Sequence, residues 1–424
     1  MVLRSKNAIK YSSKWIYILA NFFSGYFISL IGSISLTELF VLARIPHLIN
    51  WGNKLRSLEF KKITLLYSLL LVTQIIAEIC VGNNFINALK GVMVTVMSYF
   101  LFVFYLELLL KDITIIKWTP LTIIASLIIF GDQFGFALRG EETFFKFYLA
   151  PVVTNLVLFL ILQGNKWIQK NIILITGVTS LFVIAGGARS GGFSLLFATL
   201  AYFIYIRYKT ISWRKILPGV IIIVIIFQFF YAFVYIPKVV SGEWGSNQNR
   251  DQLARVDNSK NVLMMIFTAR TDFFVSWQAF MDKPISGHGA WANDENSKYL
   301  KMLYSLHGDE IIAGSSTNDS LIPVHSVVVG MGTQHGIFKF IIFCVLFIYI
   351  YKLGLKTLNK KLPRSYNFYL IYLWITSFQI LMFGPPAVLK STGSLAFAVF
   401  LAFYLLKKRT NEKKIQISRR NSNL

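Results

Sequence analysis

Long apolar runs recur along nearly the whole chain, and they constrain its fold more than any other feature. Most are about 18 to 20 residues long, which is the length at which a helix crosses the hydrocarbon core of a bilayer. Unpaired backbone groups are too costly in lipid, so each run is expected to be a helix. With 55% hydrophobic residues and a mean hydropathy of +0.58, the 424-residue chain is predicted to be an all-α polytopic membrane protein.

We predict about twelve transmembrane helices from the positions of these runs. The twelve spans cover Trp15–Ile31, Ser35–Asn50, Ile63–Val81, Gly91–Leu110, Ile116–Phe130, Phe147–Gln163, Asn171–Gly187, Gly191–Ile206, Ile216–Ile236, Ile337–Leu353, Tyr366–Phe383 and Ser394–Leu406.

The basic residues predict the orientation of the chain. The formal net charge is +24. Most Lys and Arg residues lie at the termini and in alternate short loops, the pattern of cytoplasmic segments in membrane proteins. This pattern explains the charge without nucleic-acid binding. Both termini are therefore predicted to be cytoplasmic, including the basic tail that begins at Lys407.

This orientation divides the chain into three parts. Residues 1–236 form an N-terminal membrane bundle of about nine helices, and residues 336–424 form about three helices and the basic tail. Between them, residues 237–335 form a large extracytoplasmic loop that holds four of the five histidines. Loops of about 100 residues are rarely simple connections. Apolar residues at helical spacing predict one amphipathic, partly surface-lying helix in this loop, over Asn261–Met281.

Familiar soluble motifs are absent: we find no phosphate-binding glycine loop, HExxH, CxxC or GxSxG pattern. The two cysteines, Cys80 and Cys344, lie in predicted spans and suit neither a disulfide nor a metal framework. The loop histidines lack the compact spacing of a zinc site, so no metal is expected. Any chemistry must come from polar groups at the outer membrane face or in the large loop.

Two arginines are candidates for binding a phosphorylated group. Arg189 lies in the outward turn between two spans, within the run AGGARSGG. The small residues would let a ligand approach the backbone, and a guanidinium can pair with pyrophosphate through two hydrogen bonds. The alternative is that the Arg189 side chain extends to the membrane–water interface and binds no ligand. Arg270 lies near the start of the expected loop helix and is a second candidate cation, with an ion pair to Asp272 as its alternative.

His325 is the candidate general base, because it lies just before the chain re-enters the membrane and imidazole titrates near neutral pH. The alternative is a polar residue at the end of a loop. His288, within Gly287-His288-Gly289, is a weaker candidate. His307 and His335 are interpreted as ordinary loop residues, and His47 as structural.

Other polar and aromatic residues outside the membrane are weaker candidates for substrate contact. Asp132 follows a span and is either a catalytic carboxylate or a helix-end acid. Most aromatic residues are expected to face lipid or the interface. Trp244, Trp277 and Trp291 lie outside the spans and could stack on sugar faces.

The order of these residues resembles the O-antigen polymerase and O-antigen ligase superfamily. An outward arginine comes first, followed by a long loop with Arg270 and Trp277. The loop continues with the run GHGAWAND at 287–294, and His325-Ser326 lies ten to eleven residues before Gly336. Lys339 stands where the ligase pattern continues with Gly, Thr or Tyr. The 284–294 segment is closer to the polymerases. The motifs cover roughly residues 185–350, and the rest is similar only in topology.

The resemblance implies a reaction at the outer face of the bacterial cytoplasmic (inner) membrane, on the periplasmic side. The donor would be an oligosaccharide on undecaprenyl pyrophosphate, a partner held in the membrane lipid. An acceptor hydroxyl would attack the anomeric carbon with inversion, with His325 as base and without a metal or other cofactor. Arg189 and Arg270 would bind the pyrophosphate, and His288, Trp277, Trp291 and Asp132 are candidate substrate contacts. A protein that regulates polysaccharide chain length would be a further partner, and nucleic acid is not expected.

Three functions follow from these observations. The favoured one is polymerisation of O-antigen or another surface polysaccharide, in lipopolysaccharide or related biosynthesis. The second is an O-antigen ligase that transfers the glycan to lipid A-core. A third, from another class, is a flippase or transporter of lipid-linked oligosaccharide. Transporters tend to have repeated halves and helices broken at the midplane, and neither is visible in the sequence.

Overall fold

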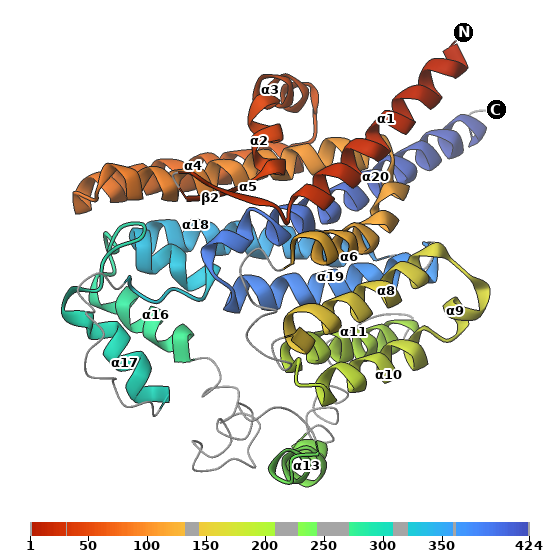
Figure 1. Ribbon diagram of the computed structural model, residues 1–424. Helices are drawn as coiled ribbons and strands as arrows, with labels where there is room; N and C mark the ends of the chain where they lie inside the picture. The colour runs from red at the N-terminus through yellow and green to blue at the C-terminus, as the bar shows by residue number, and fades with distance from the viewer. Residues whose placement is uncertain are drawn as a thin grey trace.

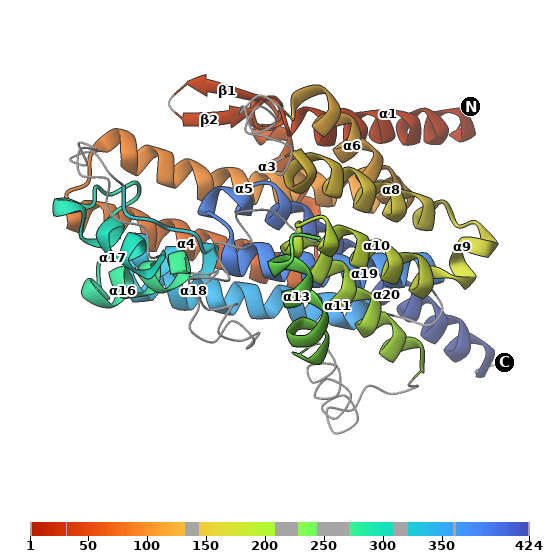
Figure 2. The same ribbon diagram turned by 60° about the horizontal axis from the view of Figure 1, so that its bottom comes forward.

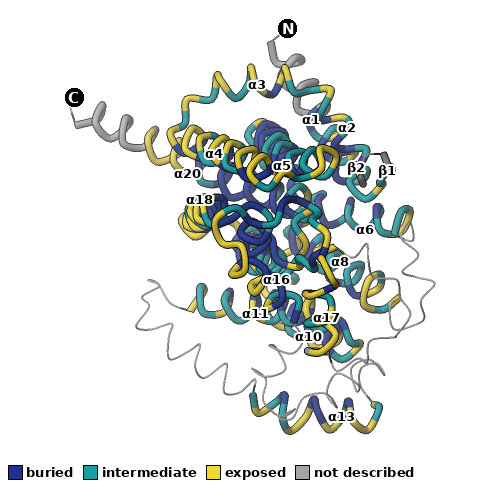
Figure 3. The backbone as a smooth tube through the Cα atoms, turned by 90° about the vertical axis from the view of Figure 1, so that its left-hand side faces the viewer, coloured by how far each residue is buried: buried dark blue, intermediate teal, exposed yellow. Residues whose placement is uncertain are grey.

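The centre of the fold consists of two helices that are apolar all round where they cross the membrane. They are α5 (Phe85–Lys111) and the first half of α20 (Thr392–Ser422). Residues Leu101–Leu109 and Ala396–Phe403 are buried without interruption. A helix that is apolar all round must be covered on every side. Other helices cover these two, and the buried positions therefore gather in the middle of the bundle (Figure 3).

The computed structural model describes residues 2–30, 32–131, 144–207, 228–243, 271–307, 321–358 and 362–422. Besides α5 and α20, the elements in chain order are α1 (Val2–Phe23), β1 (Phe27–Leu30), β2 (Gly32–Ser35), α2 (Leu36–Ala43), α3 (Ile45–Lys54), α4 (Leu58–Val81), η1 (Ile113–Trp118), α6 (Thr119–Phe130), η3 (Phe145–Leu149), α8 (Ala150–Gln163), α9 (Lys166–Lys170), α10 (Ile172–Ala185), α11 (Arg189–Arg207), η4 (Tyr231–Tyr235), α13 (Ile236–Val240), α16 (Thr271–Asp282), η5 (Glu295–Ser297), α17 (Lys298–His307), α18 (Val327–Thr357), α19 (Arg364–Phe383) and η7 (Pro386–Leu389).

The chain is an all-α membrane protein. Within the described ranges, eight helices are long and apolar enough to cross a bilayer. Large aliphatic side chains such as Leu65 and Ile79 on α4, and Ile341 and Val345 on α18, point away from the core and are exposed. Such a surface would be unstable in water but is suited to lipid.

The bundle has two chemically different ends (Figure 1). We call one the basic end: it holds both termini and α9, and here Lys408 pairs with Glu59 at 3.0 Å. We call the other the loop end, because α16 and α17 lie there beside the start of α18 (Figures 1 and 2). The turn between α4 and α5, at Gly82–Asn84, also lies at the loop end.

The first two predicted spans have a different structure from that expected. Helix α1 ends at Phe23, and the residues up to Ser35 form an antiparallel hairpin, in which Phe27 pairs with Ser35 (Figure 2). Ser35 then caps α2 in a reciprocal capping box with Glu38. The chain bends at Arg44, next to Pro46 in the first turn of α3. Helices α2 and α3 have 8 and 10 residues, so neither crosses a bilayer by itself.

Helix α18 also differs from its prediction. It begins at Val327, before the predicted start at Ile337, so the predicted division between residues 335 and 336 falls inside it. Gly336 interrupts the helix with φ +77° and ψ −176°. A break in this helix was not predicted, and it is important for the site. The predicted loop helix over Asn261–Met281 is confirmed in its described part, as α16.

Candidate functional site

Of the predicted site residues, Arg270, Asp132 and also Trp244 lie outside the described residues. The other five lie toward the loop end of the bundle. His325 precedes α18, Arg189 begins α11, Trp277 lies on α16, and His288 and Trp291 lie in the segment that follows α16.

His325 is exposed, although the segment around it is firmly held. The next residue, Ser326, is buried and caps α18 by accepting a hydrogen bond from the Val329 amide at 3.1 Å. On the other side, the Pro323 carbonyl accepts a hydrogen bond from the Ser276 hydroxyl on α16 at 2.8 Å. The imidazole is therefore presented to the surroundings from a fixed backbone, which suits a group that exchanges protons with a bound substrate.

Arg189 is half-buried at the first position of α11, where its guanidinium lies over the Tyr235 ring at 6.0 Å from the centroid. The turn before it uses Gly187 at φ +93°. The neighbouring glycine has a packing role, because a Cβ at Gly186 would lie 1.9 Å from the Phe145 ring. The small residues of this turn thus serve helix packing in part, and are not all explained by ligand approach.

The loop-end part of α19 connects these elements. The Gln379 side chain hydrogen-bonds the hydroxyls of Ser190 and Ser194 on α11. One turn later, the Phe383 ring contacts the Phe273 ring on α16 at 5.8 Å. Since Ser190 follows Arg189 and Phe273 lies three residues after Arg270, α19 brings the neighbours of both arginines to the same end of the bundle.

The segment Pro284–Asp294, which we call the strap, fills the break in α18. At a helix break, carbonyls and amides lose their usual partners and need others. The His288 amide donates to the Thr333 carbonyl at 2.9 Å, and the Gly289 amide donates to the Gln334 carbonyl at 2.8 Å. In return, the Ile337 amide donates to the Pro284 carbonyl at 2.7 Å.

Glycines make this close approach possible. A Cβ at Gly336 would lie 1.9 Å from the Ile285 carbonyl oxygen, and one at Gly287 would lie 2.5 Å from the Gln334 carbonyl. Both glycines also have positive φ, of +77° and +70°. No other residue type fits these positions without moving the backbone.

His288 belongs to this packing rather than to a free surface. Its Nε2 lies 2.8 Å from the Ala279 carbonyl, so this nitrogen carries the proton and donates. Burial is the main cause that lowers the pKa of His288 below its ordinary value. The ring is therefore neutral near pH 7 and connects the strap to α16.

Backbone strain is concentrated at the end of the strap. Among the described residues, the only non-glycines with positive φ are Trp291, Asn296 and Ser297, with φ between 49° and 59°. Such conformations cost about 1–3 kcal/mol each and cluster at functional sites. Asp294, which is buried between them, caps α17 by accepting hydrogen bonds from the amides of residues 299 and 300 at 3.1 and 2.7 Å.

The two described tryptophans have different surroundings. Trp277 is 41% exposed, and its ring forms edge-to-face contacts with the rings of Phe280 and Phe340. Trp291 is half-buried, and its carbonyl accepts a hydrogen bond from the Asn87 side chain at 3.3 Å. Trp277 therefore offers more free surface for stacking on a sugar.

A buried polar cluster beneath the strap was missed in the sequence. We call it the Glu78 cluster: Gln74, Glu78, Thr95, His335 and Lys339. His335 was interpreted as a loop residue, and this is wrong: it lies inside α18, and its Nε2 is 2.8 Å from a Glu78 carboxylate oxygen. The Lys339 ammonium donates to the Gln74 side-chain oxygen at 2.7 Å. Glu78 and Lys339 inside predicted spans were a usable signal, because ionisable groups are rare there.

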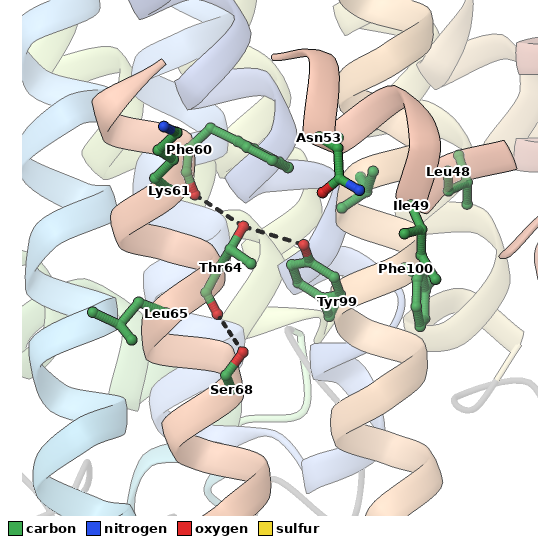
Figure 4. A pocket seen from close by; sticks show the side chains of 12 residues that line it. Leu48, Ile49, Asn53, Phe60, Lys61, Thr64, Leu65, Ser68, Tyr99 and Phe100 are labelled. Atoms are coloured by element: carbon green, nitrogen blue, oxygen red, sulfur yellow. Dashed lines mark hydrogen bonds between the residues drawn. The ribbon is translucent and has the colours of Figure 1, made fainter. Parts of the chain in front are cut away.

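The basic end has a second polar cluster, around Glu107, and a cavity. Neither contains a predicted catalytic residue. The cavity has a volume of about 510 Å³ and lies between α3, α4 and α5 (Figure 4). Figure 4 shows Thr64 in its wall, with its hydroxyl bonded to the Tyr99 hydroxyl at 3.1 Å. Leu65, Phe100 and Lys61 give the cavity a largely apolar wall with a basic rim. The five predicted site residues that the structure describes lie away from it, toward the loop end.

No protein-family model matches the sequence, and no curated protein matches it. Among the described residues, no three His, Cys, Asp or Glu side chains are grouped to hold a metal ion. The candidate site thus consists of exposed His325 and half-buried Arg189, both toward the loop end. The strained strap and the buried Glu78 cluster lie at the same end of the bundle.

Proposed function

We propose that the protein is a glycosyltransferase of the bacterial cytoplasmic membrane that polymerises undecaprenyl-pyrophosphate-linked oligosaccharide repeat units on the periplasmic side. The observation that carries this proposal is the exposed His325 on a fixed backbone at the loop end, where α19 also contacts the neighbours of Arg189 and Arg270. In this orientation both termini are cytoplasmic and the loop end is periplasmic, which agrees with the basic residues at the opposite end.

The proposed chemistry is a single displacement. The oxygen of an acceptor-sugar hydroxyl forms a bond to the anomeric carbon of the donor, and the bond from that carbon to the pyrophosphate oxygen breaks. His325 takes the hydroxyl proton, and the configuration at the anomeric carbon inverts. Undecaprenyl pyrophosphate leaves with its charge matched by the two arginines, so the residues supply the charge stabilisation.

A site at the membrane boundary suits such a donor. The polyprenyl tail needs an apolar environment, whereas the pyrophosphate and sugars need water and polar groups. The loop end provides both, because α4 and α18 carry exposed aliphatic side chains and reach the strap at this end. The exposed face of Trp277 adds a platform on which a sugar ring can stack.

Transport of a lipid-linked oligosaccharide is a second candidate function, and one observation favours it. Broken helices and buried ionisable residues are typical of transporter sites, and α18 has both, at Gly336 and at His335 and Lys339. However, the backbone groups at this break are bonded to the strap. The break is thus closed by the protein itself, which favours a structural role.

One reconstitution separates these functions. Purified protein in vesicles is given a lipid-linked repeat unit, and the products are separated on a gel. A ladder of increasing length supports polymerisation, whereas transfer only after addition of lipid A-core indicates a ligase. Movement of a fluorescent lipid-linked oligosaccharide between leaflets, with no new glycosidic bond, would replace the proposal with transport.

A further inference from the structure

The strap is held from two sides, and the second side has no role in the mechanism above. On one side its backbone is bonded into the break in α18. On the other side it meets the loop end of α4, where two side chains reach it. The Ala290 amide donates to a Glu78 carboxylate oxygen at 3.1 Å, and the Asn83 side chain donates to the Ala290 carbonyl at 2.9 Å.

Glu78 joins three elements at once. Besides the strap amide, its carboxylate accepts hydrogen bonds from the Asn83 side chain at 2.6 Å and from His335 Nε2 at 2.8 Å. The strap, the turn after α4 and the broken part of α18 therefore share one carboxylate. The space around it is tight, since a Cβ at Gly91 would lie 2.5 Å from the Ala290 Cβ and 3.3 Å from a Glu78 oxygen.

The hydrogen bonds also assign the charges. Because Nε2 of His335 donates to Glu78, its Nδ1 is free to accept, and the Lys339 ammonium lies 3.3 Å from it. A neutral imidazole thus lies between one carboxylate and one ammonium, and the three groups have no net charge. Buried charges are tolerated in such an arrangement because each is hydrogen-bonded, Glu78 by Asn83 and His335, and Lys339 by Gln74.

A short path of backbone bonds leads from Glu78 to His325. Two residues after Ala290, the Ala292 carbonyl accepts a hydrogen bond from the Ile322 amide at 3.1 Å. The next strap residue, Asn293, forms an antiparallel bridge with Leu321. Ile322 lies three residues before His325, so displacement of the strap would displace the backbone that presents the imidazole.

We propose that Glu78 and Asn83 are positioning residues for the transfer reaction: together they fix the strap in the break of α18 and thereby hold His325 at the reacting hydroxyl. This inference rests on the proposed function. It differs from a role in folding alone, because it requires a loss of rate in protein that is folded and still binds donor. A misplacement of about 1 Å lowers a rate on the order of 100-fold.

The test compares Glu78→Gln with Glu107→Gln. Glutamine keeps an acceptor for the Ala290 amide but removes the charge that matches Lys339. Glu107 is the matched control, because it is also a buried carboxylate bonded to a histidine and a lysine, at the basic end. Each variant is assayed in vesicles for kcat and for KM of the lipid-linked donor. Strap movement is followed by labelling Asn293→Cys with a membrane-impermeant maleimide, in a background with Cys80→Ser and Cys344→Ser.

For Glu78→Gln we expect kcat to fall by about 10- to 100-fold with KM changed less than about threefold, together with faster labelling at position 293. Glu107→Gln should leave both readouts near those of wild type. If Glu78→Gln does not fold, Asn83→Ala is used. It removes the bond to the Ala290 carbonyl and one hydrogen bond to Glu78, but it keeps the Glu78 carboxylate with its bonds to His335 and to the Ala290 amide. It should show the same effects more weakly.

Three results would overturn the proposal. Faster labelling with unchanged kcat would mean that the strap does not position the reaction. Unchanged labelling would mean that α4 does not hold the strap. A rise in KM with constant kcat would indicate donor binding instead of positioning. If wild type transfers no sugar at all, the proposed function fails, while the labelling comparison still decides whether Glu78 and Asn83 hold the strap.

Discussion

The two ends of the membrane bundle contain clusters of the same residue types in different surroundings. At the loop end, Glu78 is bonded to His335, which contacts Lys339. At the basic end, Glu107 accepts hydrogen bonds from Lys111 at 2.6 Å and lies 3.0 Å from His47, with Arg44 at 3.4 Å. We call the latter group the Glu107 cluster.

The clusters differ in exposure and in what they join. The His47 and Lys111 side chains are 53% and 39% exposed, whereas those of His335 and Glu78 are 1% and 5% exposed. Lys111 lies one turn from Glu107 on the same helix, so that pair is local. The Glu78 cluster joins α4, α5, α18 and the strap. The difference teaches that a Glu–His–Lys group can be a partly exposed ion pair at a helix end or a fully buried cluster that fixes a loop, according to its surroundings.

The largest expected difference between the clusters concerns their lysines. Lys339→Met leaves the Glu78 carboxylate without its matching charge in a buried site, which should lower the free energy of unfolding by about 3–5 kcal/mol. Lys111→Met removes a partly exposed pair, and Glu107 keeps Arg44, so the loss should be about 1 kcal/mol or less. Unfolding by SDS in mixed micelles measures both. Equal losses would erase the distinction between the two clusters.

The next largest expected difference is in the loss of stability when a glycine near each cluster is replaced by alanine. Gly336→Ala places a Cβ against the Ile285 carbonyl in a backbone conformation reserved for glycine, with a cost of about 1–3 kcal/mol from strain alone. Gly52→Ala, in α3 near the Glu107 cluster, meets only the Phe60 ring at 3.3 Å and gains helix propensity. We expect a lower melting temperature for the first and a change near zero for the second. A stable Gly336→Ala variant would show that the strap does not fill the break.

A smaller effect is expected in the pH dependence of stability, to which His288 in the strap contributes. Burial lowers the pKa of His288. The unfolded chain therefore takes up a proton near pH 6.5 while the folded protein remains neutral. The contribution of His288 is fully present above that pH and is lost as the pH falls toward the folded-state pKa, with a slope of at most about 1.4 kcal/mol per pH unit.

The matched variant is His288→Asn, which should flatten the dependence of the melting temperature on pH below about 6.5. His47→Asn, in the Glu107 cluster, removes a half-exposed ring and serves as the control. An unchanged slope in His288→Asn would mean that His288 does not report on the strap.

Salt should produce the smallest difference. Added salt weakens the interactions between exposed charges, with a Debye length of about 10 Å at 0.1 M, but acts weakly on buried ones. The loss caused by Lys111→Met should therefore shrink between low and high salt, whereas the loss caused by Lys339→Met should stay constant. Parallel salt dependence in the two variants would indicate that water reaches the Glu78 cluster.

The elements that could be predicted are those whose sequence pattern lies within one continuous segment of the chain. Apolar runs located α4 through its end at Val81 and α19 through its end at Phe383, because the length of an apolar run directly reflects a helix in lipid. The hairpin at Phe27–Ser35 was missed, since its residues continue an apolar run. The Ser35–Glu38 capping box was a readable sign that a new helix begins there.

Only part of the candidate site could be predicted from the sequence, because some of its contacts join residues far apart in the chain. His325 and Arg189 could be selected from their neighbours in the chain. The role of His335 depends on Glu78, which is 257 positions away, and the break at Gly336 depends on a strap that arrives from another part of the chain. Such partners are defined by packing, which a single sequence does not reveal.

The most direct measurement of the central claim is glycan transfer by His325→Gln. Glutamine keeps the hydrogen-bonding capacity of the side chain but does not take up a proton near neutral pH. Wild type and variant are inserted equally into vesicles, and the initial rate of ladder formation from a lipid-linked repeat unit is measured. The account predicts a loss of at least about 100-fold with the melting temperature unchanged. A ladder of normal rate and length from His325→Gln would contradict it.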